Sequence, residues 1–192
     1  VDIGGTNIRY AYSNIGDSDF VSENKAELDS LNDFYNLMSE LLAEADVKNI
    51  VFSVAGPKVN NSIKMTNRNF EIDADEIRKK FNLESCYLLN DWESIGYSIR
   101  TFSENDFDNF KDGEPFNDTF LVIGPGTGLG ASVISDNNVI ATEIGNTNLG
   151  LSALKSLLEI NSDEFNVLED IISGTGISRM FEIKTGNKVT SE

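Results

Sequence analysis

Two polar residues, Asn90 and Asp91, follow the apolar run 85–89 where a strand is predicted to end and a helix to begin. A carboxylate in such a place can orient an alcohol and accept its proton while a phosphoryl group is transferred. The same pair can instead cap the helix that we expect to begin at Trp92. The residues alone leave both roles open for Asp91.

Two glycine-rich turns, DIGGTN at residues 2–7 and GPGTGLG at residues 124–130, each lie between two predicted strands. Glycine lets peptide N–H groups approach an anion closely, so either turn can hold a phosphate without a basic side chain. A dinucleotide-binding loop needs a helix after its glycines, whereas the second turn leads into the strand-like run 131–135. A Walker loop needs Gly-Lys-Ser/Thr, which the sequence lacks. An ordinary hairpin turn stays open for each.

Histidine is absent from the sequence, which excludes serine–histidine triads, histidine zinc sites and imidazole acid–base catalysis. The single cysteine, Cys86, permits neither an internal disulfide nor a cysteine zinc site, and its isolation favours a cytoplasmic location. A general base must therefore be a carboxylate, a lysine, a tyrosine or Cys86.

The chain is acidic, with 32 Asp and Glu against 15 Lys and Arg and a formal net charge of −17. This charge repels nucleic-acid phosphates and anionic lipids, so we expect neither a nucleic acid nor a membrane as partner. No apolar run approaches the ~18 residues that a membrane helix needs. A polyanionic nucleotide would have to be bound through backbone donors and a divalent cation.

The hydrophobic pattern predicts an α/β fold built from two similar blocks. In the first block we expect strands at 1–3, 8–13, 20–26, 49–55, 62–66 and 85–89, and helices at 31–45, 73–81 and 92–102. In the second we expect strands at 119–123, 131–135 and 139–143, and helices at 151–160, near 165–172 and at 175–184. We therefore predict a smaller N-terminal domain at 1–102, a boundary at 103–118 and the first part of a larger domain at 119–192.

Five segments, in this order, resemble bacterial-type glucokinases: DIGGTNIRYAY, SVAGP with MTNRNFEID, LLNDWESIGYSI, GPGTGLGASVI and LEDIISGTGI. These enzymes are hexokinase-like members of the sugar kinase, chaperone and actin superfamily. The resemblance implies an actin-like, ribonuclease H-like ATPase fold, with two domains and a cleft between them. It implies phosphorylation of glucose at the 6-hydroxyl by ATP with Mg²⁺, the first step of glycolysis. It further implies truncation at both ends, an incomplete second domain and poor activity of this fragment, and it leaves a homodimer open.

The resemblance also implies a role for individual residues. Asp91 is the base toward the 6-hydroxyl, and Asn90 binds the hexose beside it. The other sugar contacts are expected at Asn67, Glu143, Asn146 and Glu169. The first phosphate loop is expected at Gly4, Gly5, Thr6 and Asn7, and the second at Gly126, Thr127 and Gly128. Asp2 is expected to help hold magnesium. Taken singly, Glu143 and Glu169 also read as solvated surface charges.

One position departs from the family pattern, because many bacterial glucokinases carry histidine where Asn146 stands. Asparagine keeps a donor and an acceptor, so sugar binding can survive while the preference among hexoses is open. Two other functions stay open: a non-catalytic, sugar-responsive regulator on the same fold, and a kinase for mannose, fructose or an N-acetylhexosamine. The sequence lacks the cysteine-rich zinc motif of the related repressor and open-reading-frame kinase family, which disfavours membership of that family.

Overall fold

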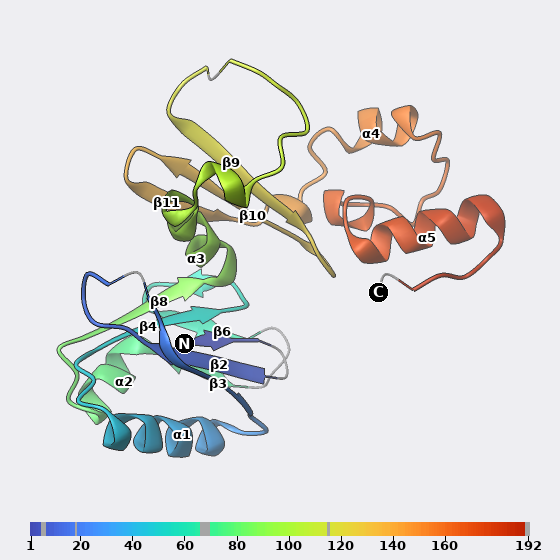
Figure 1. Cartoon of the computed structure of the whole chain (residues 1–192). Helices are drawn as coiled ribbons and strands as arrows, with labels where there is room; N and C mark the ends of the chain where they lie inside the picture. The colour runs from blue at the N-terminus through green and yellow to red at the C-terminus, as the bar shows by residue number, and fades with distance from the viewer. Residues whose placement is uncertain (5–6, 18, 66–69, 115, 191–192) are drawn as a thin grey trace. The chain divides into compact units, whose positions relative to one another are not determined.

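The structure is a computed structural model that describes residues 1–4, 7–17, 19–65, 70–114 and 116–190 (Figure 1). The chain forms two compact units, Val1–Ser94 (unit 1) and Ile95–Glu192 (unit 2). The division falls inside helix α3, Asp91–Ser98, rather than in the polar stretch 103–118. The domain limits 1–102 and 119–192 stay a prediction, and each unit is described by itself.

Unit 1 is built on a five-stranded sheet in the order β3-β2-β1-β4-β8. A second sheet of three short strands, in the order β5-β6-β7, is formed by the segment of the chain between β4 and β8. Strands β1, β4 and β8 run parallel, whereas β2 and β3 pair antiparallel with their neighbours. The elements are β1 Asp2–Ile3, β2 Asn7–Tyr12, β3 Val21–Glu27, α1 Leu31–Glu44, β4 Asn49–Val54, β5 Lys58–Val59, β6 Ser62–Lys64, β7 Glu71–Asp73, α2 Ala74–Lys80 and β8 Ser85–Asn90.

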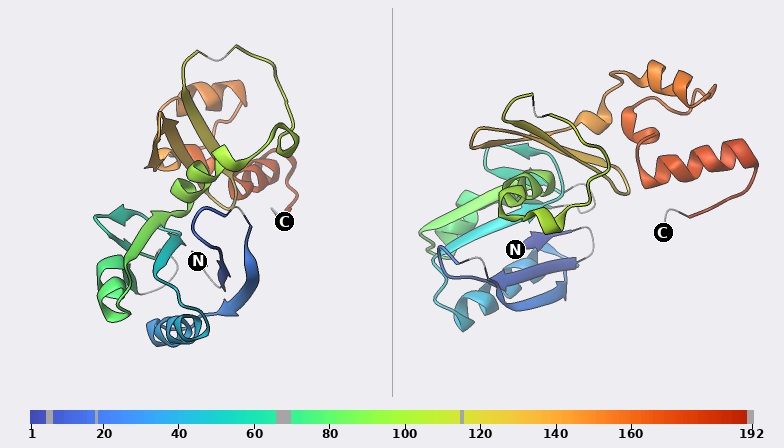
Figure 2. Two further views of the ribbon diagram at one scale, coloured as in Figure 1. Left: turned by 60° about the vertical axis from the view of Figure 1, so that its left-hand side comes forward. Right: turned by 45° about the horizontal axis from the view of Figure 1, so that its top comes forward.

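Alternating side chains give the sheet of unit 1 one buried face. In β4, Ile50, Phe52 and Val54 are buried, while Val51 between them is exposed. Helix α1 lies along this sheet and contributes residues at helical spacing to the same core, among them Phe34, whose ring centroid is 5.8 Å from that of Phe52 (Figures 1 and 2). Each such side chain stabilises the unit by roughly 1.5–3 kcal/mol through burial.

The register of the parallel strands brings their carboxyl ends to one edge of the sheet. Ile3 of β1 pairs with Val54 of β4, and Val54 pairs with Asn90 of β8. The residues that follow these strands therefore leave the sheet at the same edge. In open α/β sheets this edge is where ligands usually bind.

Unit 2 contains a three-stranded antiparallel sheet in the order β11-β10-β9. A separate core forms among the helices that follow it, around Leu151, Ile160, Phe165 and Ile171. The elements, with η marking a 3₁₀-helix, are η1 Ile99–Thr101, η2 Glu104–Asp106, β9 Thr119–Pro125, β10 Leu129–Ser135, β11 Asn138–Thr142, η3 Ile144–Asn146, α4 Leu151–Leu157, η4 Leu168–Asp170 and α5 Gly174–Thr185.

Apart from shifted element ends and short 3₁₀-helices, the sequence-based elements differ from the structure in two short strands and one helix. Strands β5 and β7 were not expected, because two or three residues are too few to show a period. The helix predicted near 165–172 was wrong, since only the short η4 forms there. The carboxylate of Asp170 accepts hydrogen bonds from the backbone N–H groups of Asn166 and Val167 at 2.7 and 2.9 Å, which starts a separate turn at this point.

None of the helices in the described ranges combines the length and the apolar character that crossing a bilayer requires.

Candidate functional site

Asp91 lies at the carboxyl edge of the unit 1 sheet, as the first residue of α3. The side chain is half-buried, and its Oδ1 accepts a hydrogen bond from the Trp92 backbone N–H at 3.0 Å. Desolvation by burial raises the pKa of Asp91, and the negative charge of Asp2 raises it further, against the lowering effect of backbone hydrogen bonds. A carboxylate with a raised pKa is a better proton acceptor, which suits a general base.

Asn90 caps α3, so the helix begins one residue earlier than the sequence suggested. Its Oδ1 accepts hydrogen bonds from the N–H groups of Trp92 at 2.9 Å and Glu93 at 3.3 Å. Its Nδ2 donates to the carbonyl oxygen of Gly56 at 2.9 Å, and the residue is only 8% exposed. The side chain of Asn90 also hydrogen-bonds to Asp91, which lowers the pKa of that carboxyl against the effect of burial.

The partner of Asn90 is a turn that requires glycine. Gly56 follows β4 with a φ of +145°, a conformation that L-residues rarely adopt. A Cβ at this position would also lie 2.7 Å from the carbonyl oxygen of Lys64, closer than real contacts allow. The turn at Gly56 therefore holds the side chain of Asn90 and, through it, the start of α3.

The first glycine turn leaves β1 at the same edge. The N–H of Gly4 donates to the carbonyl oxygen of Asn7 at 2.9 Å and closes the turn. Gly5 and Thr6, predicted in this loop, and the predicted sugar contact Asn67 lie outside the described residues.

Asp2 presents an exposed carboxylate beside this turn. Its nearest cation is Arg9, with an N–O separation of 3.8 Å and both side chains at least half exposed, so this ion pair is weak. Among the described residues no group of three or more metal-binding side chains gathers. Mg²⁺ is usually held by one or two carboxylates together with substrate phosphates and water, and a single available carboxylate fits that mode.

In unit 2 the second glycine turn, between β9 and β10, is held by the start of α5. The N–H of Gly174 donates to the carbonyl oxygen of Gly126 at 2.8 Å, and the Thr175 hydroxyl donates to that of Thr127 at 3.1 Å. Ser173 caps α5 by accepting from the N–H of Gly176 at 2.9 Å. The SGTG segment therefore positions the predicted phosphate turn.

Glu169 reaches the same turn from η4. Its Oε2 accepts a hydrogen bond from the N–H of Leu129 at 3.2 Å. A Cβ at Gly128 would lie 2.8 Å from this oxygen, and a Cβ at Gly145 would lie 3.3 Å from it. Glu169 is thus a partly buried carboxylate in contact with the turn rather than a solvated surface charge. It also lines a cavity of about 210 Å³ together with Thr127 and Gly128.

Glu143 and Asn146 flank the buried Gly145 and stay exposed. The Asn146 Nδ2 donates to Glu143 Oε2 at 3.2 Å. Because Gly145 is packed against Leu129 and Glu169, unit 2 brings Glu143, Asn146, Glu169 and the second glycine turn together.

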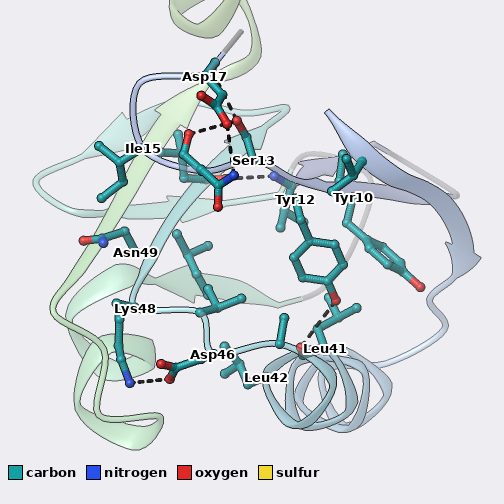
Figure 3. A pocket seen from close by; sticks show the side chains of 18 of the residues that line it. Tyr10, Tyr12, Ser13, Ile15, Asp17, Leu41, Leu42, Asp46, Lys48 and Asn49 are labelled. Atoms are coloured by element: carbon teal, nitrogen blue, oxygen red, sulfur yellow. Dashed lines mark hydrogen bonds and ion pairs between the residues drawn. The ribbon is translucent and has the colours of Figure 1, made fainter. Parts of the chain in front are cut away.

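A larger cavity of about 510 Å³ in unit 1 lies apart from these residues (Figure 3). Its lining includes Val1, the β2 residues Tyr10–Tyr12 and the first residues of β4, at the end of the sheet opposite Asp91. The Tyr12 hydroxyl donates to the Leu41 carbonyl oxygen at 3.3 Å across it. Its described lining contains none of the candidate site residues, and we assign it no role in substrate binding.

Sequence reasoning missed two charged residues that hold the start of α3, Glu93 and Lys58. Glu93 accepts a hydrogen bond from the N–H of Asn90 at 3.1 Å, and the Lys58 Nζ donates to both Glu93 carboxylate oxygens at 3.1 and 3.2 Å. The pattern Asn90-x-x-Glu93 at a helix start was a readable signal for the first contact. Nothing local in the sequence signals the second.

Comparisons with solved structures identify the class of fold. The chain matches a crystal structure of glucokinase from an Antarctic psychrotroph with a TM-score of 0.73 and 24% identity, covering 98% of this chain and 65% of that one. It matches a ROK family glucokinase from Streptomyces griseus, in complex with glucose and AMPPNP, with a TM-score of 0.60 and 19% identity, covering 96% and 61%. The fold is therefore the actin-like ATPase fold of the sugar kinases, as the sequence predicted.

The glucokinase family model matches residues 1–192. A glucokinase of Nostoc punctiforme is 27% identical over 208 aligned residues, which take in 100% of this chain and 61% of the relative. The chain belongs to the glucokinase family, which confirms the resemblance read from its motifs. It spans about three fifths of the length of the relatives it matches.

Proposed function

We propose that the protein transfers a phosphoryl group from ATP to the 6-hydroxyl of glucose, with Asp91 as general base. The observation that carries this proposal is a half-buried carboxylate with a raised pKa, held at the carboxyl edge of three parallel strands beside a glycine turn. Membership of the glucokinase family supports the substrate pair. The complex of the Streptomyces griseus relative with glucose and AMPPNP supports it as well.

On the sugar side, Asp91 accepts the proton of the 6-hydroxyl as the oxygen bonds to the terminal phosphorus and the bond to the ADP oxygen breaks. Asn90 offers an amide N–H to a sugar hydroxyl beside Asp91 in this proposal. We assign further hydroxyl contacts to Glu143, Asn146 and Glu169, and to Asn67 on the basis of the family motif. Carboxylates and amides pair well with neighbouring hydroxyls of a hexose ring.

On the phosphate side, the backbone N–H groups of the two glycine turns are the donors in this proposal. They are residues 4–7 and 126–128, which need no basic side chain in a protein with a net charge of −17. Asp2 is the residue we assign to Mg²⁺, which supplies neutralisation of the charge on the transferred group. Positioning and charge neutralisation provide most of the catalysis of phosphoryl transfer.

The choice of hexose depends on Asn146 in this proposal. In unit 2 its amide is turned toward Glu143, so the pair offers a sugar one amide oxygen, one free N–H and a carboxylate. Glucose is the substrate that the family supports, and a kinase for another hexose is the second candidate.

A coupled assay of ADP release with a panel of hexoses tests the proposal on the full-length protein, with this 192-residue chain assayed in parallel. We expect saturable, glucose-dependent release from the full-length protein and little from the chain alone. ADP release with mannose, fructose or an N-acetylhexosamine, and not with glucose, would assign the protein a different substrate but the same reaction. Calorimetric binding of a hexose without any release would instead indicate a regulator.

A further inference from the structure

We infer that Glu93 and Lys58 form a positioning pair that fixes the orientation of Asp91. This inference rests on the proposed function, since it concerns the base of that reaction. Neither residue is expected to touch the sugar or the phosphates. Both act through the first turn of α3, of which Asp91 is the first residue.

The first contact is a reciprocal pair of hydrogen bonds around Asp91. The N–H of Asn90 donates to Glu93 Oε2 at 3.1 Å, and the N–H of Glu93 donates to Asn90 Oδ1 at 3.3 Å. This arrangement is a capping box, which satisfies two backbone donors that a helix start otherwise leaves open. Asp91 lies inside the closed loop, so its backbone orientation is set from both sides.

The second contact ties this capping box to a neighbouring strand. Lys58 on β5 donates to Glu93 Oε1 at 3.2 Å and to Oε2 at 3.1 Å. Its position follows from the Gly56 turn, whose carbonyl oxygen is also the acceptor for Asn90. The start of α3 is therefore anchored twice to one short segment, residues 56–58.

Burial makes the charge of Lys58 matter. The Glu93 side chain is only 12% exposed and that of Lys58 is 29% exposed, so water screens the pair poorly. The charge that acts on Asp91 is that of Asp2 on β1, itself near Arg9. Lys58 thus contributes by holding the Glu93 carboxylate in place rather than by changing the charge around the base.

An ordinary helix cap would show the same hydrogen bonds, and a matched control separates the two roles. In α1, Ser30 and Asp33 form a similar capping pair, with Ser30 Oγ donating to Asp33 Oδ2 at 2.7 Å. Asp33 is far along the chain from the candidate residues and is exposed. Asp33→Ala removes the side-chain half of this capping pair without touching the proposed site.

The test compares Glu93→Ala, Glu93→Gln, Lys58→Met and Asp33→Ala in the full-length protein. We expect Glu93→Ala to lower kcat by about 10- to 100-fold with little change in the KM for glucose, because the base loses its orientation. Glu93→Gln should recover most of kcat, because an amide oxygen can still accept from Asn90. Asp33→Ala should lower Tm and leave kcat unchanged. If Glu93→Ala and Asp33→Ala behave alike, Glu93 is only a cap and the inference is overturned.

A measurement that does not depend on turnover tests this inference separately from the proposed reaction. Trp92 is the only tryptophan of the 192-residue chain and adjoins Asp91, so its fluorescence can follow the protonation of that carboxylate. We expect Lys58→Met and Glu93→Ala each to move the midpoint to lower pH. Burial raises the pKa of Asp91, and its carboxylate becomes better solvated when the start of α3 is less firmly held. Asp33→Ala should leave the midpoint unchanged. These shifts support the pair even if the full-length protein phosphorylates no hexose. Unchanged midpoints in both Lys58→Met and Glu93→Ala overturn it even if the kinase is active.

Discussion

The two units position their candidate residues in different ways, although each contains a glycine turn between two strands. In unit 1 the residues leave the ends of parallel strands that share a large core with α1 and α2. In unit 2 they lie on an antiparallel hairpin and on 3₁₀-turns, joined by a few long-range hydrogen bonds. The first geometry comes from the sheet itself, and the second from particular contacts.

This difference predicts how each unit responds to mutation. A substitution at the edge of the unit 1 sheet can remove a reacting group while the backbone that carries it stays in place. In unit 2 the carboxylate of Glu169 both belongs to the candidate sugar site and holds the N–H of Leu129. A substitution there should affect binding and local structure together.

The largest effect should follow from Asp91→Asn in the full-length protein. The amide cannot accept the proton of the sugar hydroxyl, so we expect kcat to fall by about 10²–10⁴-fold. Glucose affinity, measured by calorimetry, should change far less, because the amide keeps hydrogen-bonding capacity. Near-normal turnover by this variant would remove Asp91 as the base.

The same substitution should stabilise unit 1 at neutral pH. Burial raises the pKa of Asp91 above its usual value, so the folded state holds the proton more tightly than the unfolded state does. The ionised carboxylate therefore costs stability at pH 7, and this cost disappears as the pH falls through the raised pKa toward the ordinary value. We expect Asp91→Asn to have the higher Tm at pH 7, with the difference shrinking in acid. A lower Tm at pH 7 would contradict a desolvated carboxylate.

Glu169→Ala comes next in expected size. A hydrogen bond to a charged group contributes roughly 1.5–3 kcal/mol, so losing the sugar contact should weaken glucose binding by about 10- to 100-fold. Glu169→Gln retains an acceptor for the N–H of Leu129 and should preserve Tm better than the alanine variant. Equal glucose affinity in all three proteins, measured by calorimetry, would return Glu169 to a purely structural role.

Gly145→Ala probes the packing that gathers the unit 2 residues. The added Cβ would lie 2.6 Å from the Leu129 carbonyl oxygen, so the backbone has to move. Overpacking of this kind typically costs about 1–3 kcal/mol, which denaturant unfolding can measure. Gly113→Ala is the matched control, because a Cβ there meets nothing within 4 Å. Indistinguishable unfolding midpoints for the two variants would show that the backbone around Gly145 accommodates the added methyl group without cost.

The smallest effect is expected from the cap of α1 in unit 1. Ser30 accepts a hydrogen bond from the N–H of Asp33 at 3.2 Å, and its removal by Ser30→Ala should cost about 1 kcal/mol. Ser39→Ala, on the surface of the same helix, is the control and should cost less. Activity should be unaffected by either, because the core of the sheet keeps the carboxyl edge in place. A change in kcat with Ser30→Ala would show that the edge depends on α1.

Sequence reasoning located what depends on local pattern. Helix α1 was readable because Ser30 and Asp33 form a cap before apolar residues at helical spacing. Asp91 was placed at a strand-to-helix junction because the apolar run 85–89 ends at Asn90 and Asp91, just before a helical pattern. Membership of the glucokinase family was readable from five ordered motifs. The cap, the junction and each single motif are local patterns within a short segment of the chain.

Contacts between distant parts of the chain were beyond the same reasoning. The hydrogen bonds from the Gly174 and Thr175 region to the second glycine turn span nearly fifty residues, 48 in the case of Thr175 and Thr127. The ion pair of Lys58 with Glu93 spans 35 residues. A single sequence does not show which distant residues come together in the fold. Sequence reasoning therefore named the candidate residues but not the groups that hold them in place.

The turn at Gly56 has a consequence for reading natural variation in this protein. In a saturation mutagenesis screen, this position should tolerate as few replacements as Asp91, since every side chain would meet the Lys64 carbonyl oxygen. A variant isolated there would lose activity as if a catalytic residue were missing, although it removes no reacting group. Intolerance at a position therefore identifies what the base depends on as readily as it identifies the base.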